Sequence, residues 1–249
     1  LDSLVAQDFQ DWEAIVVNDT GEAWDKIPGA PYARIVTPKK NPNARIILWY
    51  WNPVKKSLPI KKTAKLSCEK WSFDENDCKK YSMCYNTQFF FETAEKNKEN
   101  IEYDVVFIGK NKGRKKELIK IQSQFNNVGL KTFFYIVENN KIFSKNHFLP
   151  YDEIIKFNKS SKAILDFVSK GQAGLTLRPL EAVFLEKKLI TNNQNINMYD
   201  FYNEKNVFIL GKNDFNSINN FVNSPYDQQN KQERVNYLFD KWVTRFFEN

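Results

Sequence analysis

Charged residues that could hold a phosphorylated ligand are concentrated in residues 160–192. An apolar run from Ala163 to Val168 predicts a strand, and a loop with two glycines follows it. Arg178 and Pro179 come next, and Glu181 lies in a run that predicts a helix. Strand, glycine loop and charged helix start are the sequence form of a nucleotide-binding α/β unit, because free N–H groups at a helix start favour an anion. We therefore expect a nucleotide site here.

The elements that would position these residues alternate between strand and helix along the second half of the chain. Apolar runs and helical periodicity from residue 104 to residue 211 predict a parallel, doubly wound sheet. The expected strands are 105–108, 132–137, 164–168, 189–191 and 207–210, and the expected helices are 115–125, 154–158, 179–185, 216–222 and 229–247. The fold class is α/β, with a Rossmann-like sheet and flanking helices.

A smaller, incomplete α/β part precedes this sheet. A strand expected from Trp12 to Val17 puts Asp19 at its carboxyl end, where α/β ligand sites lie, although Asp-Thr-Gly is also good turn chemistry. Another strand is expected at 46–51, and a short edge strand at 89–91. Asp74 and Asp77 follow as helix-cap residues. The expected domains are 1–103, divided into 1–40 and 44–103, and 104–249.

The composition and charge of the chain restrict the kinds of molecule that it is expected to bind. The chain has 249 residues, 42% of them hydrophobic and 27% charged, which is typical of a globular protein. No apolar run is long enough to span a membrane. The net charge of +7 favours phosphorylated ligands or an anionic membrane surface, although an AT-rich genome also produces scattered lysines. Lysine greatly outnumbers arginine and no nucleic-acid motif occurs, so we expect no nucleic-acid partner.

Metal and disulfide chemistry are not expected. The three cysteines, Cys68, Cys78 and Cys84, do not have zinc-site spacing, and the single histidine, His147, is far away in sequence. An odd cysteine count suits a reducing cytosol. We expect a cytoplasmic protein that touches the inner face of the membrane peripherally. The chain begins at Leu1, which suits a fragment, a fusion or a processed product.

Two resemblances to glycosyltransferases are visible. Residues 1–36, with Ser3-Leu4, Gln7, Trp12-Glu13 and Ile15 to Asp19, resemble the opening of family 2 enzymes of the GT-A fold. Residues 44–249 resemble a bacterial lipopolysaccharide or capsule glycosyltransferase of the GT-B type. The stretches that carry this second resemblance are IILWYWNP (46–53), WSFDENDC (71–78), FIGKNKGR (107–114) and QAGLTLRPLEA (172–182).

The GT-B resemblance implies a donor site for a nucleotide-sugar. Gly109 would let the backbone approach a phosphate, Lys112 or Arg114 would neutralise the diphosphate, and Glu181 would bind the ribose hydroxyls. The segment 175–177 would form a loop over the nucleotide, and Pro179 would be the first helical residue. The implied donor-binding residues are Gly109, Lys112, Arg114, Leu177, Arg178 and Glu181, and the GT-A resemblance adds Asp19.

The sequence does not identify the catalytic residues. GT-B enzymes place their base in an acceptor domain, for which about 60 residues remain here, so Asp74 and Asp77 are only weak candidates beside their helix-cap role. His147 is expected to be a loop residue. No D-x-D metal motif occurs, so we expect a metal-independent reaction without a cofactor. Glu181 could also belong to a solvated helix face, Arg178-Pro179 could be only a helix start, and 110–116 could be a solvated loop.

The preferred function is a glycosyltransferase that moves a sugar from a nucleotide-sugar to a glycan or lipid-linked acceptor of the cell surface. The alternative is a non-catalytic nucleotide- or glycan-binding module, or a truncated or fused transferase. The short acceptor half favours this alternative. Neither the sugar nor the base, acceptor, linkage, stereochemistry or oligomeric state can be predicted from these residues.

Overall fold

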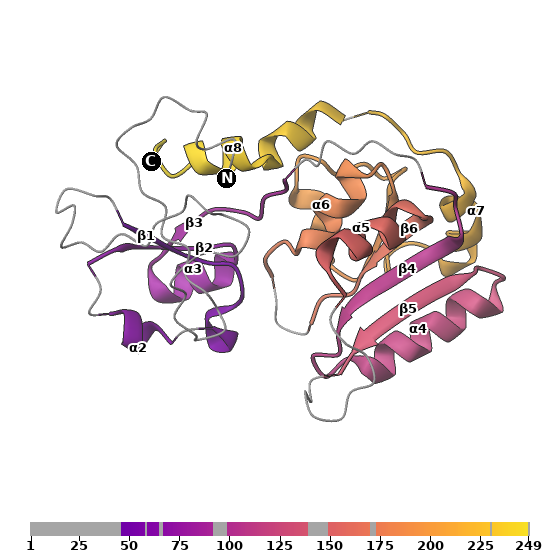
Figure 1. The fold of residues 1–249 in the computed structure, drawn as a ribbon, viewed down its shortest axis with the longest axis horizontal. Helices are drawn as coiled ribbons and strands as arrows, with labels where there is room; N and C mark the ends of the chain where they lie inside the picture. Colours follow the sequence, from indigo (N-terminus) through magenta and orange to yellow (C-terminus); the bar gives the residue numbers. More distant parts are fainter. Residues whose placement is uncertain are drawn as a thin grey trace. The chain divides into compact units, whose positions relative to one another are not determined.

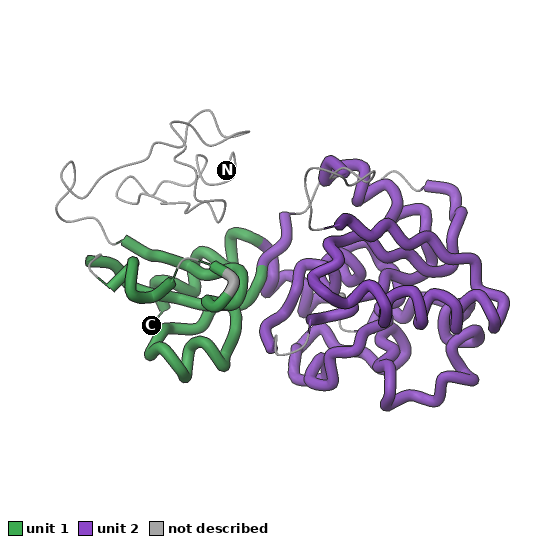
Figure 2. Tube along the Cα trace, turned by 90° about the horizontal axis from the view of Figure 1, so that it is seen from below, with its two compact units in different colours: residues 1–88, 239–249 green, residues 89–238 purple. Residues whose placement is uncertain are grey.

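The computed structural model describes residues 46–57, 59–64, 67–91, 99–138, 149–169, 173–229 and 231–248 (Figure 1). The chain divides into two compact units, coloured separately in Figure 2. Unit 1 contains the described residues up to Gln88 and those from Phe239 onward, and unit 2 is Phe89–Leu238. The expected division at residue 103 therefore differs from the division by packing, and the C-terminal segment groups with unit 1.

Unit 1 contains a three-stranded parallel sheet with the order β1-β2-β3. The strand expected at 46–51 is confirmed as β1 (Ile47–Tyr50). The strands β2 (Glu69–Ser72) and β3 (Cys84–Tyr85) were not expected, because they are short and lack an apolar run. The helical elements are η1 (Val54–Lys56), α2 (Ile60–Thr63) and α3 (Glu75–Tyr81).

The C-terminal helix α8 (Phe239–Thr244) completes the aromatic core of unit 1. The ring of Trp242 lies 4.8 Å from that of Trp49, edge to face, and Phe246 meets Trp71 in the same way at 4.8 Å. The indole Nε1 of Trp242 donates to the carbonyl of Thr87 at 2.7 Å. Such edge-to-face pairs add to the free energy of burial, so the last residues of the chain are part of this core.

Unit 2 is a doubly wound parallel sheet, as expected from the sequence. Its strand order is β5-β4-β6-β7-β8, and all neighbours are parallel. The strands are β4 (Tyr103–Lys110), β5 (Thr132–Val137), β6 (Ser161–Asp166), β7 (Lys188–Thr191) and β8 (Val207–Ile209). These strands are mostly buried, as a parallel sheet with helices on both faces requires. The fold class is therefore α/β and Rossmann-like.

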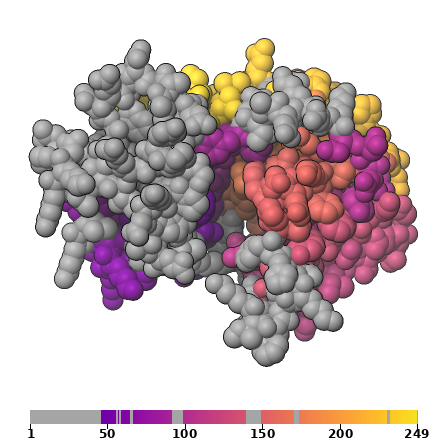
Figure 3. All heavy atoms as spheres, in the orientation of Figure 1, coloured from indigo at the N-terminus to yellow at the C-terminus, as the bar shows by residue number. Residues whose placement is uncertain are grey.

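Each face of this sheet has its own apolar cluster. Leu118 and Phe125 of α4 pack with Ile218 of α7 on one face. Leu180 and Ala182 of α6 pack on the other face. The described helices of unit 2 are α4 (Lys115–Asn127), α5 (Tyr151–Lys159), α6 (Leu177–Phe184), α7 (Ile218–Asn223) and the short η2 (Ile196–Met198), η3 (Phe215–Ser217) and η4 (Lys231–Tyr237). Salmon-coloured atoms of α5 are visible on the surface in Figure 3.

Three details differ from the sequence-based expectations. Helix α6 begins at Leu177, so Pro179 is its third residue and not its first. The edge strand expected at Phe89–Phe91 is a single parallel bridge between Phe90 and Leu238. The helix expected at 229–247 is two elements, η4 and α8.

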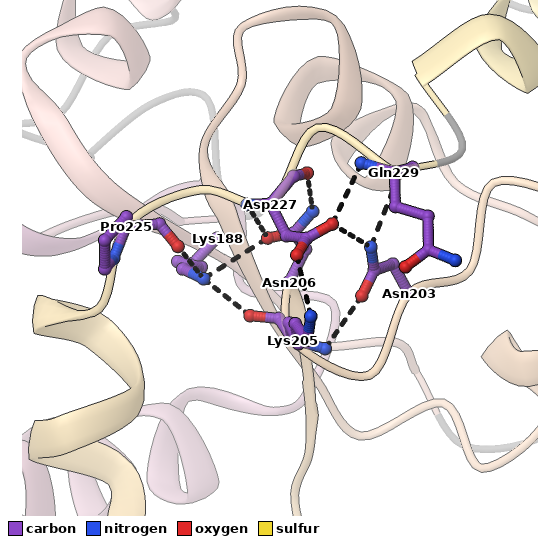
Figure 4. A network of polar contacts seen from close by, with 7 residues as sticks. All are labelled: Lys188, Asn203, Lys205, Asn206, Pro225, Asp227 and Gln229. Atoms are coloured by element: carbon purple, nitrogen blue, oxygen red, sulfur yellow. Dashed lines mark hydrogen bonds and ion pairs between the residues drawn. The ribbon is translucent and has the colours of Figure 1, made fainter.

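Lys188 anchors the segment that follows α7 to the amino end of the sheet (Figure 4). The residue is 2% exposed, and its ammonium donates to the carbonyls of Lys205 (2.5 Å) and Pro225 (2.8 Å) and to Asn206 Oδ1 (3.2 Å). Asn206 Nδ2 in turn donates to the carbonyl of Asp227 at 2.7 Å. The three ammonium hydrogens thus have three acceptors, which offsets the cost of burying the charge.

None of the described helices is both long and apolar enough to cross a membrane.

Candidate functional site

The candidate site lies where the connections of the unit 2 sheet diverge. From β4 the chain goes to β5 on one side and then to β6 on the other side of β4, so the loops after β4 and β6 leave in opposite directions. In open parallel sheets, ligands bind outside the carboxyl ends of the strands at such a switch point. The residues at these two strand ends are therefore the first candidates.

Arg114 comes from the loop that follows β4. Lys112 and Gly113 have φ values of 46° and 81°, and this tight turn brings Arg114 to the N-cap position of α4. The arginine is 8% exposed, and its Nη2 donates to the carbonyl of Lys110 at 3.3 Å. Its guanidinium carbon lies 5.3 Å from the centroid of the Phe107 ring. An exposed loop residue, Lys112, thus precedes the buried Arg114 by two positions.

Arg178 reaches the same aromatic ring from α6. Its guanidinium carbon is 5.0 Å from the Phe107 centroid, and both Nε (3.2 Å) and Nη2 (2.5 Å) donate to the carbonyl of Ile108. Burial, and after it the charge of Arg178, lowers the pKa of Arg114 to about 10, while the charge of Asp166 opposes the shift. The two cations are therefore close enough to repel each other.

Asp166, the last residue of β6, is the acidic partner of Arg178. It is 1% exposed and accepts hydrogen bonds from Thr176 Oγ1 at 2.7 Å and Thr191 Oγ1 at 3.3 Å. Its Oδ1 lies 3.8 Å from Arg178 Nη1. Asp166 was not among the site residues predicted from the sequence. The sequence does contain a signal for it, because Asp166 lies inside an apolar strand run and a buried carboxylate rarely lacks a partner.

Gly109 lies directly beside the guanidinium group of Arg178. A Cβ on Gly109 would lie 2.1 Å from Arg178 Nη2, so the space beside this glycine is filled by the guanidinium. A residue with a side chain would displace the arginine. The expectation that a phosphate approaches the backbone here stays a prediction.

Two polar atoms at this edge have no partner. Within the described part of unit 2, the buried side-chain polar atoms without a hydrogen bond are Arg114 Nε and Ser169 Oγ. Arg114 follows β4 and Ser169 follows β6, so both lie in loops at the switch point. An unsatisfied buried donor costs about 1–3 kcal/mol. Because buried polar groups are normally paired, these two atoms indicate a place for a ligand.

Glu181 lies one turn after Arg178 on α6. The residue is 4% exposed, and its Oε2 accepts from Asn158 Nδ2 at 3.1 Å. Tyr151 also hydrogen-bonds to this carboxyl group. Burial raises the pKa of Glu181, while Arg178, Tyr151 and Asn158 oppose the shift and Asp166 adds to it. Glu181 is thus a buried acid and not part of a solvated helix face.

The remaining expected site residues are placed differently. Leu177 is the first residue of α6 and packs against the core, so its expected loop position is wrong. Asp74 caps α3 by accepting from the backbone N–H groups of Asn76 and Asp77, and Asp77 Oδ2 accepts from Val54 N at 2.7 Å. The helix-cap interpretation of Asp74 is confirmed. Asp19 and His147 lie outside the described residues.

The described ranges hold no group of three or more His, Cys, Asp or Glu side chains that could bind a metal ion. The expected independence from metals stays a prediction.

The arrangement at the switch point can bind an anion. Two guanidinium groups, Arg114 and Arg178, share one carboxylate, Asp166, and one donor of Arg114 is unused. The N-terminus of α4, which has 13 residues, starts beside them. Cations and free helix N–H groups in one crevice favour phosphate. Comparison of the chain with protein-family models and with curated proteins finds no match.

Proposed function

We propose that this protein is a glycosyltransferase that takes a sugar from a nucleotide-sugar donor and transfers it to a glycan or lipid-linked acceptor of the cell surface. The observation that carries the proposal is the excess of positive charge around a buried carboxylate at the switch point of a Rossmann-like sheet. Arg114 and Arg178 face one buried carboxylate, Asp166, and Arg114 Nε lacks an acceptor. A diphosphate supplies the missing negative charge and the missing acceptors.

In this proposal the reaction is a displacement at the sugar. The acceptor hydroxyl attacks C1, the bond between C1 and the diphosphate oxygen breaks, and its electron pair goes to the diphosphate. Arg114, Arg178 and the start of α4 stabilise the charge that develops on the leaving group. Asp166 keeps Arg178 oriented and does not touch the substrate. The base that receives the hydroxyl proton is not assigned.

A second candidate function is a nucleotide- or glycan-binding module without catalysis. The observation that favours it is that both candidate bases, Asp74 and Asp77, already accept structural hydrogen bonds. Asp74 is 2% exposed and caps a helix, and Asp77 accepts a backbone hydrogen bond. Peripheral contact with an anionic membrane and a cytoplasmic location stay predictions in both cases.

Nucleotide binding tests the donor site. The intact chain is titrated calorimetrically with UDP, GDP, CMP and dTDP, with and without manganese, and Arg114→Gln and Arg178→Gln are compared with Arg234→Gln. Arg234 is a matched control, since it pairs with Glu186 at 3.6 Å and lies 5.6 Å from the Phe184 ring. We expect metal-independent binding that falls at least tenfold in the first two variants and stays unchanged in the control.

Release of nucleoside diphosphate from the matching nucleotide-sugar separates the two functions. Turnover that is lost in the Arg178 variant supports the transferase, and tight binding without turnover supports the binding module. A chain that binds no nucleotide, or one whose affinity is equal in all three variants, contradicts the donor site.

A further inference from the structure

The ring of Phe107 is the point at which the two arginines of the anion site meet. Phe107 is 0% exposed, and the guanidinium carbons of Arg114 and Arg178 lie over its ring at 5.3 Å and 5.0 Å from the centroid. Arg114 precedes α4 and Arg178 lies on α6, and these two helices pack in different core clusters. One aromatic side chain is therefore a shared partner of cations from both sides of the sheet.

The two guanidinium groups need such a partner because they are close together in a site that excludes most water. Asp166 lies 3.8 Å from Arg178 Nη1. Arg114 donates to the carbonyl of Lys110, and its Nε has no acceptor. One carboxylate for two cations leaves an excess of positive charge, which favours side chains that turn out toward water in the empty protein. A further attraction is required to keep both arginines in place.

An aromatic ring supplies this attraction without using the hydrogen-bond donors of the cation. The face of the ring carries partial negative charge, and the attraction of an arginine to it is largest where water is excluded. A ring has no carboxylate or carbonyl oxygen to which the guanidinium N–H groups can bind, so they remain available to an anion. A second carboxylate would occupy these N–H groups and cancel the charge. Phe107 is therefore a partner that does not compete with an anionic ligand.

The surroundings fix the position of this ring. Phe107 lies in the same core cluster as Phe125 of α4, and its ring centroid is 5.6 Å from that of Phe134. Gly109 follows two residues later on the same face of β4 and has no side chain. A Cβ there would lie 3.4 Å from Phe107 Cζ and 2.1 Å from Arg178 Nη2. The glycine thus leaves the space in which the guanidinium of Arg178 reaches the ring.

We propose that Phe107 is a positioning residue that keeps both guanidinium groups assembled over its ring in the empty site. The inference rests on the anion site of the proposed function. The ring does not touch the ligand. It orders two long side chains before binding, and so it reduces the entropy that the ligand must overcome and raises the affinity for the anion. The affinity for a phosphate compound therefore depends on the electrons of this ring and not only on its volume.

Phenylalanines with an increasing number of ring fluorines, placed at position 107 of the full chain, test this dependence. Fluorine withdraws electrons from the ring face and changes the shape of the ring little. The probe is inorganic pyrophosphate, titrated calorimetrically at fixed ionic strength. We expect its affinity to fall stepwise along the series, by about three- to tenfold for the most fluorinated ring. Phe107→Leu, which removes the ring, should weaken binding at least as much.

The same series at Phe125 is the matched control. Phe125 is also 0% exposed and lies in the same cluster, and its ring partners are Phe134 and Phe215. Fluorination there, or Phe125→Leu, should leave the affinity for pyrophosphate unchanged, even where it lowers the midpoint of urea denaturation as much as the change at Phe107.

Two results would overturn the inference alone. Equal pyrophosphate affinity along the Phe107 series would mean that ring electrons do not hold the arginines, and an equal fall along the Phe125 series would assign the effect to packing. A wild-type chain that binds no pyrophosphate would remove the anion site and the inference together. A chain that binds pyrophosphate with the expected dependence on the ring, but binds no nucleotide, would support the inference and contradict the proposed function.

Discussion

Unit 2 buries cations at both ends of its sheet, and it treats them in opposite ways. At the amino end, Lys188 has three acceptors for its three hydrogens. At the carboxyl end, Arg114 donates to the carbonyl of Lys110, but its Nε has no acceptor and a second arginine lies nearby. Both residues are almost fully buried. Lys188 and Arg114 are therefore similar in burial. They differ in whether all their hydrogen-bond donors have an acceptor.

This difference separates a structural cation from a binding one. A buried charge whose hydrogen bonds are complete holds segments together, as Lys188 holds the loop that leads to Asp227. A buried charge with an open donor destabilises the empty protein and is retained where a ligand completes it. The same substitution should therefore have opposite effects on stability at the two ends.

Lys188→Met gives the largest expected effect. It removes the donor shared by three acceptors, among them the carbonyls of Lys205 and Pro225, and so frees the segment that Lys188 anchors. We expect the free energy of unfolding to fall by about 2–4 kcal/mol, measured by urea denaturation. Lys162→Met is the control, since Lys162 pairs with Asp104 at 2.7 Å on the surface and should cost less than about 1 kcal/mol. Equal losses of unfolding free energy in the two variants would contradict a special structural role for Lys188.

Arg114→Met should have the opposite sign. The change removes a buried guanidinium with an open donor and its repulsion from Arg178, so we expect the free energy of unfolding to rise by about 1 kcal/mol. Nucleotide affinity should fall at least tenfold in the same variant. Urea denaturation and calorimetric titration of one preparation measure both. A clear loss of stability would mean that Arg114 is structural, like Lys188.

Gly109→Ala tests whether Arg178 is held in its observed place. The new Cβ would lie 2.1 Å from Arg178 Nη2 and should push the guanidinium away from the carbonyl of Ile108. We expect a loss of about 1 kcal/mol in stability and a weaker nucleotide complex. In a double-mutant cycle, Gly109→Ala should cost much less in the Arg178→Ala background. Additive losses would indicate that the two positions do not interact.

Glu181→Gln has the smallest expected effect on stability and a defined pH dependence. Burial raises the folded-state pKa of this carboxyl group above 4.5, so the folded chain holds the proton more tightly than the unfolded chain. That contribution is complete below pH 4.5 and is lost as the pH rises through the folded-state pKa. The variant should therefore be about 0.5–1 kcal/mol more stable than the wild type at pH 7 and less so at pH 4.

Thermal unfolding across this pH range measures the effect, with Glu153→Gln on the exposed side of α5 as the control. A difference between Glu181→Gln and the wild type that is the same at every pH would contradict a raised pKa.

The sequence predicted the elements of unit 2 well and the contacts of its site only in part. Strand β5 matches its predicted bounds, Thr132 to Val137, because an apolar run between a glycine turn and polar residues specifies a strand locally. The two arginines and Glu181 were also candidates. Asp166 was missed, and the filling of the Gly109 space by Arg178 could not be foreseen. The second depends on residues about 70 positions apart meeting across the sheet, which no local pattern encodes, whereas Asp166 was missed although its place in an apolar strand run is a local signal.

Unit 1 was harder to predict for a related reason. Strand β2 has the sequence EKWS and β3 has two residues, so neither carries a periodic signal. Their stability comes from aromatic packing by residues of α8, which lie more than 150 positions later in the chain. The expected domain 104–249 therefore included these C-terminal residues, which the packing groups with unit 1.

The membership of α8 in the core of unit 1 has a consequence for synthesis on the ribosome. Trp242 and Phe246 pack against Trp49 and Trp71, and they are translated after all of unit 2. The sheet of unit 2 can form while the chain is still emerging, but the core of unit 1 is incomplete until these aromatic residues leave the exit tunnel. The described residues of unit 1 up to Gln88 therefore finish folding last, and nascent chains that stop before residue 239 should expose Trp49 and Trp71 to chaperones.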